Sequence, residues 1–214
     1  LLIAVKQGGP DPAGNAKLKE VIAKCKANNM PNDTINNAIK KASGEGSNAN
    51  YEEITYEGYG TNGVAVIVKA NTDNRNRTAA DVRHLFDKFN GSLGTSGSVT
   101  YMFDYKGMIV LSKREKNNED DVMMVALDNG ADDVVTSEEC FEITCAPDLI
   151  HTISKAFEEA GYEVVSSEVE YLPQNMIALD KDSAISVNKL IVSLEDLDDV
   201  QNVYTNADLS VLDE

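Results

Sequence analysis

The sequence lacks a hydrophobic run long enough to cross a lipid bilayer. Its longest uninterrupted apolar segment runs from Val122 to Leu127, whereas a membrane-spanning helix needs about 20 residues. The apolar start, Leu1 to Val5, has no basic residues before it, so no signal peptide is visible. Because the first residue is leucine, we expect the natural start to be missing. We expect no membrane partner.

Cysteine and histidine are scarce as well. Cys25, Cys140 and Cys145 form an odd set without a CxxC pair, so a disulfide framework is not expected. His84 and His151 stand alone, without a cysteine or second histidine at the spacing of metal ligands. These absences favour a reducing compartment, the cytoplasm, and predict neither a metal nor a cofactor.

Positive charge is in deficit overall but unevenly distributed. The 214 residues hold 19 Lys and Arg against 36 Asp and Glu, a net charge of −17. Residues 1–45 have a net charge of +3, residues 46–106 of −1, residues 107–173 of −12 and residues 174–214 of −7. This asymmetry predicts a basic end that meets a polyanion. The simplest interpretation of the acidic half is a solvated surface that keeps the protein soluble.

The first 45 residues have the pattern of packed helices. Residues 1–6 resemble the end of a helix that stops at a Gly-Gly-Pro sequence. Apolar side chains then recur at helical spacing from Leu18 to Cys25 and again from Ile35 to Ala42, where Asn32 or Asp33 could cap the second helix. Lysines flank both stripes. The sequence therefore predicts a lysine-rich helical domain over residues 1–45, followed by a linker at residues 44–47.

The remaining sequence alternates between strand and helix patterns, which predicts an α+β fold. The first group is ββαβ, with strands at 53–57, 64–69 and 98–103 and a helix at 78–89. After a turn at Lys106-Gly107, a βαββαβ group follows in the ferredoxin-like order, with strands at 108–111, 134–136, 141–144 and 163–171 and helices at 119–129 and 147–160. A final helix at 183–194 and strand at 202–205 would complete the first group. We therefore predict a discontinuous α+β domain, residues 46–106 and 174–214, with a ferredoxin-like domain, residues 107–173, inserted into it.

Motifs of catalysis and cofactor binding fail on spacing or context. Residues 58–63 match GxGxxG, but a strand rather than a helix follows, so we predict a hairpin turn. Ser96 lacks the second glycine of a nucleophile elbow, and Ile191 stands where a calcium loop starting at Asp180 would need glutamate. We therefore predict no catalytic residues and no enzyme activity.

The segment at residues 71–78, with sequence NTDNRNRT, is the strongest candidate for a binding function. It places Arg75 and Arg77 before a predicted helix N-terminus, where free N–H groups also favour anions. A capped helix whose arginines pair with nearby acids is an equally good interpretation. The candidate nucleic-acid-binding residues are the lysines of the helical domain and the basic side chains of this segment and its helix: Lys17, Lys19, Lys24, Lys26, Lys40, Lys41, Arg75, Arg77, Arg83 and Lys88.

Five stretches resemble the signature sequences of the YebC/PmpR family, whose mitochondrial relative is the translational activator of cytochrome c oxidase subunit I. They lie at residues 7–12 (QGGPDP), 28–31 (NNMP), 56–60 (YEGYG), 72–78 (TDNRNRT) and 91–99 (GSLGTSGSV). The resemblance covers the whole chain, although family members begin with a lysine-rich stretch and a full first helix. It implies a helical domain followed by two α+β domains, one inserted in the other, and no catalytic residues.

The resemblance also implies a function in gene expression. Bacterial members are described as DNA-binding transcriptional regulators, which predicts a non-enzymatic, nucleic-acid-binding regulator. The alternative is a ribosome-associated translation factor that helps the synthesis of proline-rich stretches, with ribosomal RNA as the nucleic acid. An adaptor that binds only proteins also stays open, because a ferredoxin-like unit can serve as an interaction module.

Overall fold

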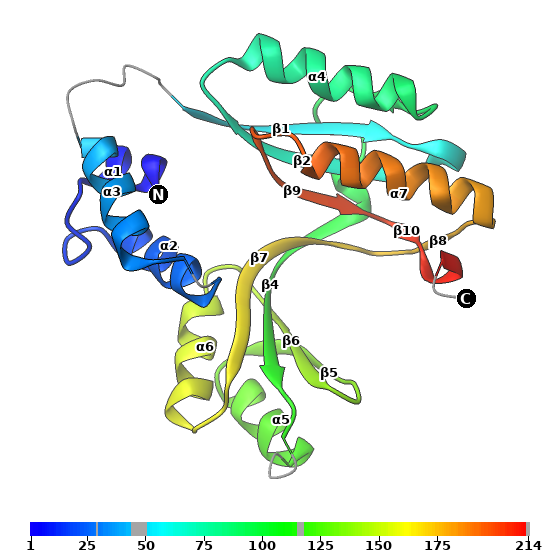
Figure 1. The fold of residues 1–214 in the computed structure, drawn as a ribbon. Coiled ribbons are helices and arrows are strands. Elements are labelled where there is room, and N and C mark those ends of the chain that lie inside the picture. The colour runs from blue at the N-terminus through cyan, green and yellow to red at the C-terminus, as the bar shows by residue number, and fades with distance from the viewer. Residues whose placement is uncertain (29, 44–50, 115–117, 213–214) are drawn as a thin grey trace. The chain divides into compact units, whose positions relative to one another are not determined.

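The computed structural model describes residues 1–28, 30–43, 51–114 and 118–212, and it has the predicted α+β class (Figure 1). The chain divides into two compact units. One contains residues 1–53 with the short segment 72–75, and the other contains residues 54–71 and 76–214. The predicted linker at residues 44–47 lies outside the described residues. Within the described ranges, no helix is both long and apolar enough to span a membrane.

The first unit is built from three helices, α1 (Leu2–Gly8), α2 (Ala16–Ala27) and α3 (Asn32–Ser43). Their apolar faces bury Ala4, Val5, Leu18 and Ala42 against one another. The stripes that predicted the helices are therefore the packed faces. Asn32 is the first residue of α3 rather than the cap before it.

The second unit begins with the sheet β3-β1-β2-β9. Its strands are β1 (Glu52–Tyr59), β2 (Ala65–Thr72), β3 (Ser92–Leu93) and β9 (Val200–Thr205), and a short turn, η1 (Thr61–Gly63), connects the first two. Helices α4 (Arg75–Lys88) and α7 (Lys181–Glu195) lie along one face of this sheet (Figure 1). Val66 and Val68 of β2 are fully buried in the same cluster as Phe86 of α4 and Leu190 of α7. Strand β9 pairs antiparallel with β2, so distant parts of the sequence complete one sheet.

The other large sheet of this unit has the order β5-β6-β4-β7. Its neighbouring strands are all antiparallel, and they are β4 (Phe103–Ser112), β5 (Ala131–Thr136), β6 (Cys140–Cys145) and β7 (Val164–Pro173). Helices α5 (Glu119–Asp128) and α6 (Ile150–Glu159) pack on one face. The element order is the predicted βαββαβ. A small parallel pair, β8 (Ile177–Ala178) with β10 (Ala207–Asp208), follows.

One strand prediction and one turn prediction are wrong near the start of β4. The segment expected as a strand at 98–103 contains a 3-10 turn, η2 (Thr100–Met102), and β4 begins only at Phe103. The expected turn at Lys106-Gly107 is also absent, because β4 runs straight through it. A Cβ atom on Gly107 would lie 2.7 Å from Sγ of Cys145 and 3.1 Å from Cβ of Ile150. Glycine is therefore required there by close packing and not by a turn.

Helices α4 and α6 begin three residues away from their predicted starts. Helix α4 begins at Arg75 instead of residue 78, because Asn74 precedes it and asparagine is a favoured N-cap residue. The Oγ1 atom of Thr72 accepts a hydrogen bond from the N–H of Asn74 at 2.9 Å, which supports this start. Helix α6 begins at Ile150 instead of residue 147, since residues 146–149 form a turn closed by a 3.0 Å hydrogen bond from Leu149 N–H to the Ala146 carbonyl.

Each large sheet has its own buried apolar cluster beneath its helices. Such separate cores are the usual mark of separate domains. We therefore propose to keep the three domains with the boundaries expected from the sequence: 1–45, 46–106 with 174–214, and 107–173.

Candidate nucleic-acid interface

The start of helix α2 is fixed by the buried side chain of Asn15. Its Oδ1 atom accepts the N–H of Leu18 at 3.0 Å and caps the helix. Its Nδ2 atom donates to the carbonyls of Ala4 at 2.6 Å and Gly9 at 2.8 Å. One side chain thus satisfies backbone groups of α1, of the following loop and of α2. This arrangement holds the lysines of α2 in a defined orientation within the helical unit.

The four lysines of α2 fall into two pairs. Lys17 lies 3.4 Å from a carboxylate oxygen of Glu53, and Lys24 lies 3.8 Å from one of Glu20. Lys19 and Lys26, which are two helical turns apart, line a groove on the helical unit. Exposed ion pairs contribute only about 0–1 kcal/mol, but they still place a carboxylate beside the cation. The groove pair is therefore better placed to meet phosphate.

The groove has a volume of about 350 Å³ and runs between α2 and α3. Ile35 on its α3 side is buried, whereas both lysines are exposed. Polar amides of α3 and apolar side chains of both helices complete the lining, which consists of Pro12, Lys19, Ile22, Lys26, Asn32, Ile35, Asn36 and Ile39. The arrangement combines an apolar floor with ammonium and amide donors at the rim. Such a surface offers positive charge and hydrogen-bond donors to anionic oxygens such as those of phosphate groups.

The last turn of α3 contains the remaining lysines of this unit. Lys40 is exposed, and its carbonyl accepts a 3.0 Å hydrogen bond from the hydroxyl of Ser43. The side chain of Lys41 lies outside the described part of the structure. Lys40 is not among the described residues that line the groove. Cations at a helix C-terminus also interact favourably with the helix dipole, so Lys40 has a structural reason to be there.

Arg77 is tied to an acid from a distant part of the sequence. Its Nη2 atom lies 3.1 and 2.9 Å from the two carboxylate oxygens of Asp199. The hydroxyl of Thr78 donates to the same carboxylate at 2.7 Å, and the N–H of Asn71 donates to the carbonyl of Asp199, also at 2.7 Å. Much of the positive charge of Arg77 is therefore compensated. The predicted phosphate-binding corner lies in the first turn of α4, and one of its two arginines has this structural partner.

The other cations of α4 are spread along the helix. Arg75 is in the first turn, Arg83 is in the middle and Lys88 is in the last turn, and all three are exposed. The Nζ atom of Lys88 lies 5.2 Å from the ring centroid of Phe89, a cation–π contact. These cations therefore do not gather at the helix N-terminus.

The glycine-rich loop at residues 94–100 is organised around a buried carboxylate. Glu57 of β1 accepts the N–H groups of Gly97 at 2.7 Å, Val99 at 2.9 Å and Thr100 at 2.9 Å. Burial raises the pKa of Glu57, but these hydrogen bonds outweigh it and leave the pKa below its usual value. The N–H groups that could have cradled a phosphate are thus occupied by the chain's own glutamate. The loop has a structural role.

The remaining motifs behave as simple structural features. Residues 58–63 form the end of β1 and the turn η1 before β2, so GxGxxG is a hairpin connection as predicted. His84 and His151 are both exposed. Within the described ranges, no group of three or more His, Cys, Asp or Glu residues could hold a metal ion.

Comparison with protein-family models decides the identity of the chain's family. Residues 1–45 match the TACO1/YebC protein N-terminal domain, and residues 51–207 match the TACO1/YebC second and third domain. The chain belongs to the TACO1/YebC family. This membership confirms the resemblance found in the sequence motifs.

Two TACO1/YebC relatives are similar over nearly the whole chain. A protein of Acetivibrio thermocellus is 60% identical over 207 residues, which cover 96% of this chain and 86% of the relative. A protein of Agathobacter rectalis is 52% identical over 208 residues, with coverage of 96% and 86%. Both are named "Probable transcriptional regulatory protein". The relatives are thus named as regulatory proteins.

A solved structure of similar fold supports the TACO1/YebC assignment. The crystal structure of a conserved hypothetical protein from Aquifex aeolicus has a TM-score of 0.84 and 39% sequence identity. The match covers 97% of this chain and 85% of that protein.

Sequence reasoning missed several residues that shape these sites. Asn32 and Asn36 line the groove beside Lys19 and Lys26, and their spacing to the apolar stripe of α3 could have indicated this. Asn15 was missed because no local pattern indicates its distant carbonyl partners. Asp199 is separated from Arg77 by 122 residues, so only the folded sheet brings the two together.

Proposed function

We propose that the chain is a non-enzymatic, cytoplasmic regulator of gene expression that binds DNA and acts on transcription. The names of its relatives support a regulatory role. The observation that carries the binding proposal is the α2–α3 groove, where Lys19 and Lys26 stand over an apolar floor beside two asparagine amides. Lysines that neutralise phosphates supply most of the affinity of sequence-tolerant binding.

The residues proposed to contact phosphate are those expected from the sequence, but we expect them to contribute unequally to binding. Lys19 and Lys26 are the principal contacts because they share the groove. Lys17, Lys24 and Lys40 add charge around it, and Lys41 is retained from the sequence prediction alone. Arg75, Arg83 and Lys88 form a second, weaker surface on α4, to which Arg77 contributes less because Asp199 compensates its charge.

The test is a titration of fluorescent duplex DNA with the full chain across a series of salt concentrations. Each phosphate that a cation neutralises lowers the slope of log K against log salt by about 0.9 for duplex DNA. We expect a linear dependence whose slope corresponds to several phosphates. Absence of binding at low salt would refute the DNA proposal.

A second candidate function is that of a ribosome-associated translation factor. The uneven charge favours it, because a basic helical unit can approach RNA while a body with −12 at residues 107–173 faces basic proteins. Sucrose-gradient sedimentation of the chain with ribosomes, at increasing salt, separates the two candidates. Co-sedimentation that persists to moderate salt would favour the translation factor. Failure to co-sediment at low salt would favour the DNA-binding regulator.

A further inference from the structure

Helices α5 and α6 cover one face of the sheet β5-β6-β4-β7, and among the described residues of the same unit no helix packs on its other face (Figure 1). Ile109, Phe141 and Ile143 point toward α5 and α6 and are fully buried. Because side chains alternate along a strand, their neighbours point to the opposite face. We call that second surface the open face, and its members are Met108, Val110, Asp133, Val135, Glu142, Thr144, Ser166, Glu168 and Glu170.

Strand register arranges the open face in rows. Glu142 of β6 stands between Val135 of β5 and Val110 of β4, and Val110 is in turn opposite Ser166 of β7. In the next row, Met108 stands between Thr144 and Glu168. Val135 is 52% exposed, and Glu142 is exposed as well. The first row therefore places a carboxylate between two valines, and the second places Thr144 and Met108 between Asp133 and Glu168.

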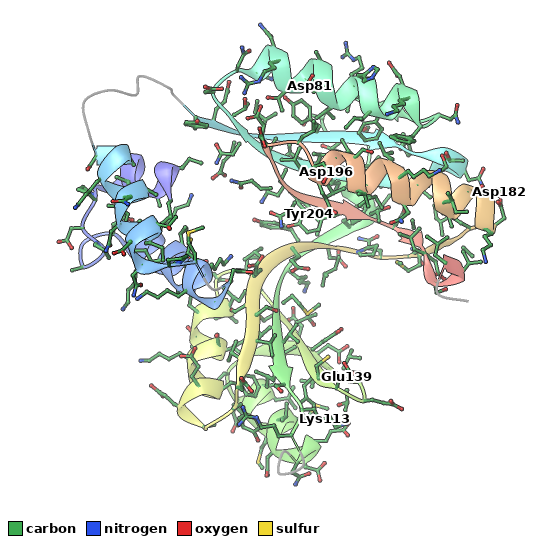
Figure 2. All side chains as sticks on the ribbon, viewed as in Figure 1. Asp81, Lys113, Glu139, Asp182, Asp196 and Tyr204 are labelled. Carbon is green, nitrogen blue, oxygen red and sulfur yellow. The ribbon has the colours of Figure 1, made fainter. Side chains whose placement is uncertain are left out.

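The charge of the open face is strongly one-sided. Its carboxylates are Asp133, Glu142, Glu168 and Glu170. Burial is the main reason that the pKa of Tyr204 on β9 is raised, and the charges of Glu170 and Glu168 raise it further, so this carboxylate charge acts at that end of the face. Lys106 follows the same alternation on β4, but its Nζ atom lies 2.5 Å from a carboxylate oxygen of Asp132. Figure 2 labels Glu139, at the β5–β6 connection, and Tyr204 on β9.

This charge disfavours two of the three classes of occupant. Phosphates of a nucleic acid would be repelled, and sheets that bind unpaired bases carry aromatic side chains, which the open-face residues named above lack. A second copy of the chain would place carboxylates opposite carboxylates, which costs free energy. A basic protein partner would instead be attracted.

We propose that the open face is a docking surface for a lysine- or arginine-rich protein segment with an apolar side. The partner's ammonium or guanidinium groups pair with Asp133 and Glu142, while its aliphatic side chains cover Val135, Val110 and Met108. Protein–protein interfaces usually combine apolar contacts with charged and hydrogen-bonded groups. This interaction is distinct from nucleic-acid binding, which we assign to the helical unit and α4.

The experiment measures binding of a fluorescent synthetic peptide, in which lysine alternates with valine, to the full chain by anisotropy. The test variant is Asp133→Asn with Glu142→Gln, which removes two charges from the open face and keeps the Oδ1 atom of residue 133 that accepts the Val134 N–H. The matched control is Asp128→Asn with Glu158→Gln. It removes two exposed charges from α5 and α6 on the opposite side of the sheet.

We expect the test variant to bind the peptide about tenfold more weakly and the control to stay within about twofold of the parent. Val135→Ser, which removes apolar area without changing charge, should weaken binding as well. Thermal unfolding checks that each variant folds, and Glu142→Gln alone replaces the double variant if that one does not.

Several results would overturn the proposal. Equal losses in the test and control variants would show attraction by bulk charge, and no loss in either, or no binding of the peptide, would show that the face is not a docking surface. A dimer that dissociates in the Asp133→Asn, Glu142→Gln variant would assign the face to a second copy. Single-stranded RNA binding that weakens in that variant alone would assign it to nucleic acid.

Discussion

The Nη2 atom of Arg77 lies 2.9 Å from one carboxylate oxygen of Asp199 and 3.1 Å from the other. This contact joins the first turn of α4 to the residue before β9, which enters the sheet from the far end of the sequence. The hydroxyl of Thr78 and the N–H of Asn71 add two more hydrogen bonds to Asp199. Arg77, expected from the sequence as a phosphate contact, therefore also holds the sheet together.

Replacement of Arg77 by alanine should lower the free energy of unfolding by about 1 kcal/mol, because it removes a charge-assisted contact to a largely buried acid. Arg83→Ala, on the exposed side of the same helix, should change it by only a few tenths. Urea denaturation of both variants measures the difference. Equal stabilities would contradict the structural role of Arg77.

Glu57→Gln should destabilise the protein by about 2 kcal/mol or more. The amide has one acceptor oxygen and no charge, whereas the buried carboxylate accepts three backbone N–H groups. Glu53→Gln, an exposed change on the same strand, is the matched control. Denaturant unfolding should separate the two variants, and a mild effect of Glu57→Gln would mean that the loop does not depend on the carboxylate.

The contribution of Glu57 should also depend on pH. Its pKa in the folded protein lies below the usual value of 4.5, so the charged form stabilises the folded state above that pH. This stabilisation is lost as pH falls through the lower pKa of the folded state. The stability gap between the parent and Glu57→Gln should therefore narrow below about pH 4.5. A gap that stays constant into acid would argue against a depressed pKa.

Asn15→Ala should loosen the helical unit, because it removes the cap of α2, a buried hydrogen bond to Ala4 and a partly buried one to Gly9. We expect a loss of about 2 kcal/mol in the opening free energy of α1 and α2. Hydrogen exchange of the amides in these helices measures it. The control is Asn28→Ala, whose side chain makes an exposed contact to the Lys24 carbonyl. Similar exchange in both variants would contradict the assigned role of Asn15.

Regular periodicity explains which elements could be predicted from the sequence. The apolar stripes of α2, α3 and α7 recur at helical spacing and β2 contains a continuous apolar run, so their burial was evident. Strands β3, β8 and β10 have two residues each, which is too short for any periodicity. Gly107 was mistaken for a turn because a local sequence does not distinguish a glycine that bends the chain from one that admits Sγ of Cys145.

The candidate site was likewise predictable where it depends on neighbouring residues, and unpredictable where it depends on residues far away in the sequence. The lysines of α2 can be counted in the sequence, and their helical spacing places Lys19 and Lys26 on one side. Their separation from Lys17, however, depends on Glu53, which lies 36 residues away. The burial of Glu57 could not be predicted either. The alternation along its strand suggests an exposed position, and Glu57 is buried only because the loop at residues 94–100 folds over it.

The division of the α2 lysines gives the sharpest prediction for binding. Lys19→Gln with Lys26→Gln removes the groove pair, whereas Lys17→Gln with Lys24→Gln removes the pair that stands beside Glu53 and Glu20. Both double variants change the net charge of the same helix by the same amount. A difference between them therefore reports position and not total charge.

The most direct test is the salt dependence of duplex DNA binding by the parent and these two double variants. The groove variant should bind more weakly, and its slope of log K against log salt should be less negative by about two. The other variant should keep most of the parent's slope. If both variants have the parent's affinity and slope, the helical unit does not contact DNA, and the proposed DNA-binding function is wrong.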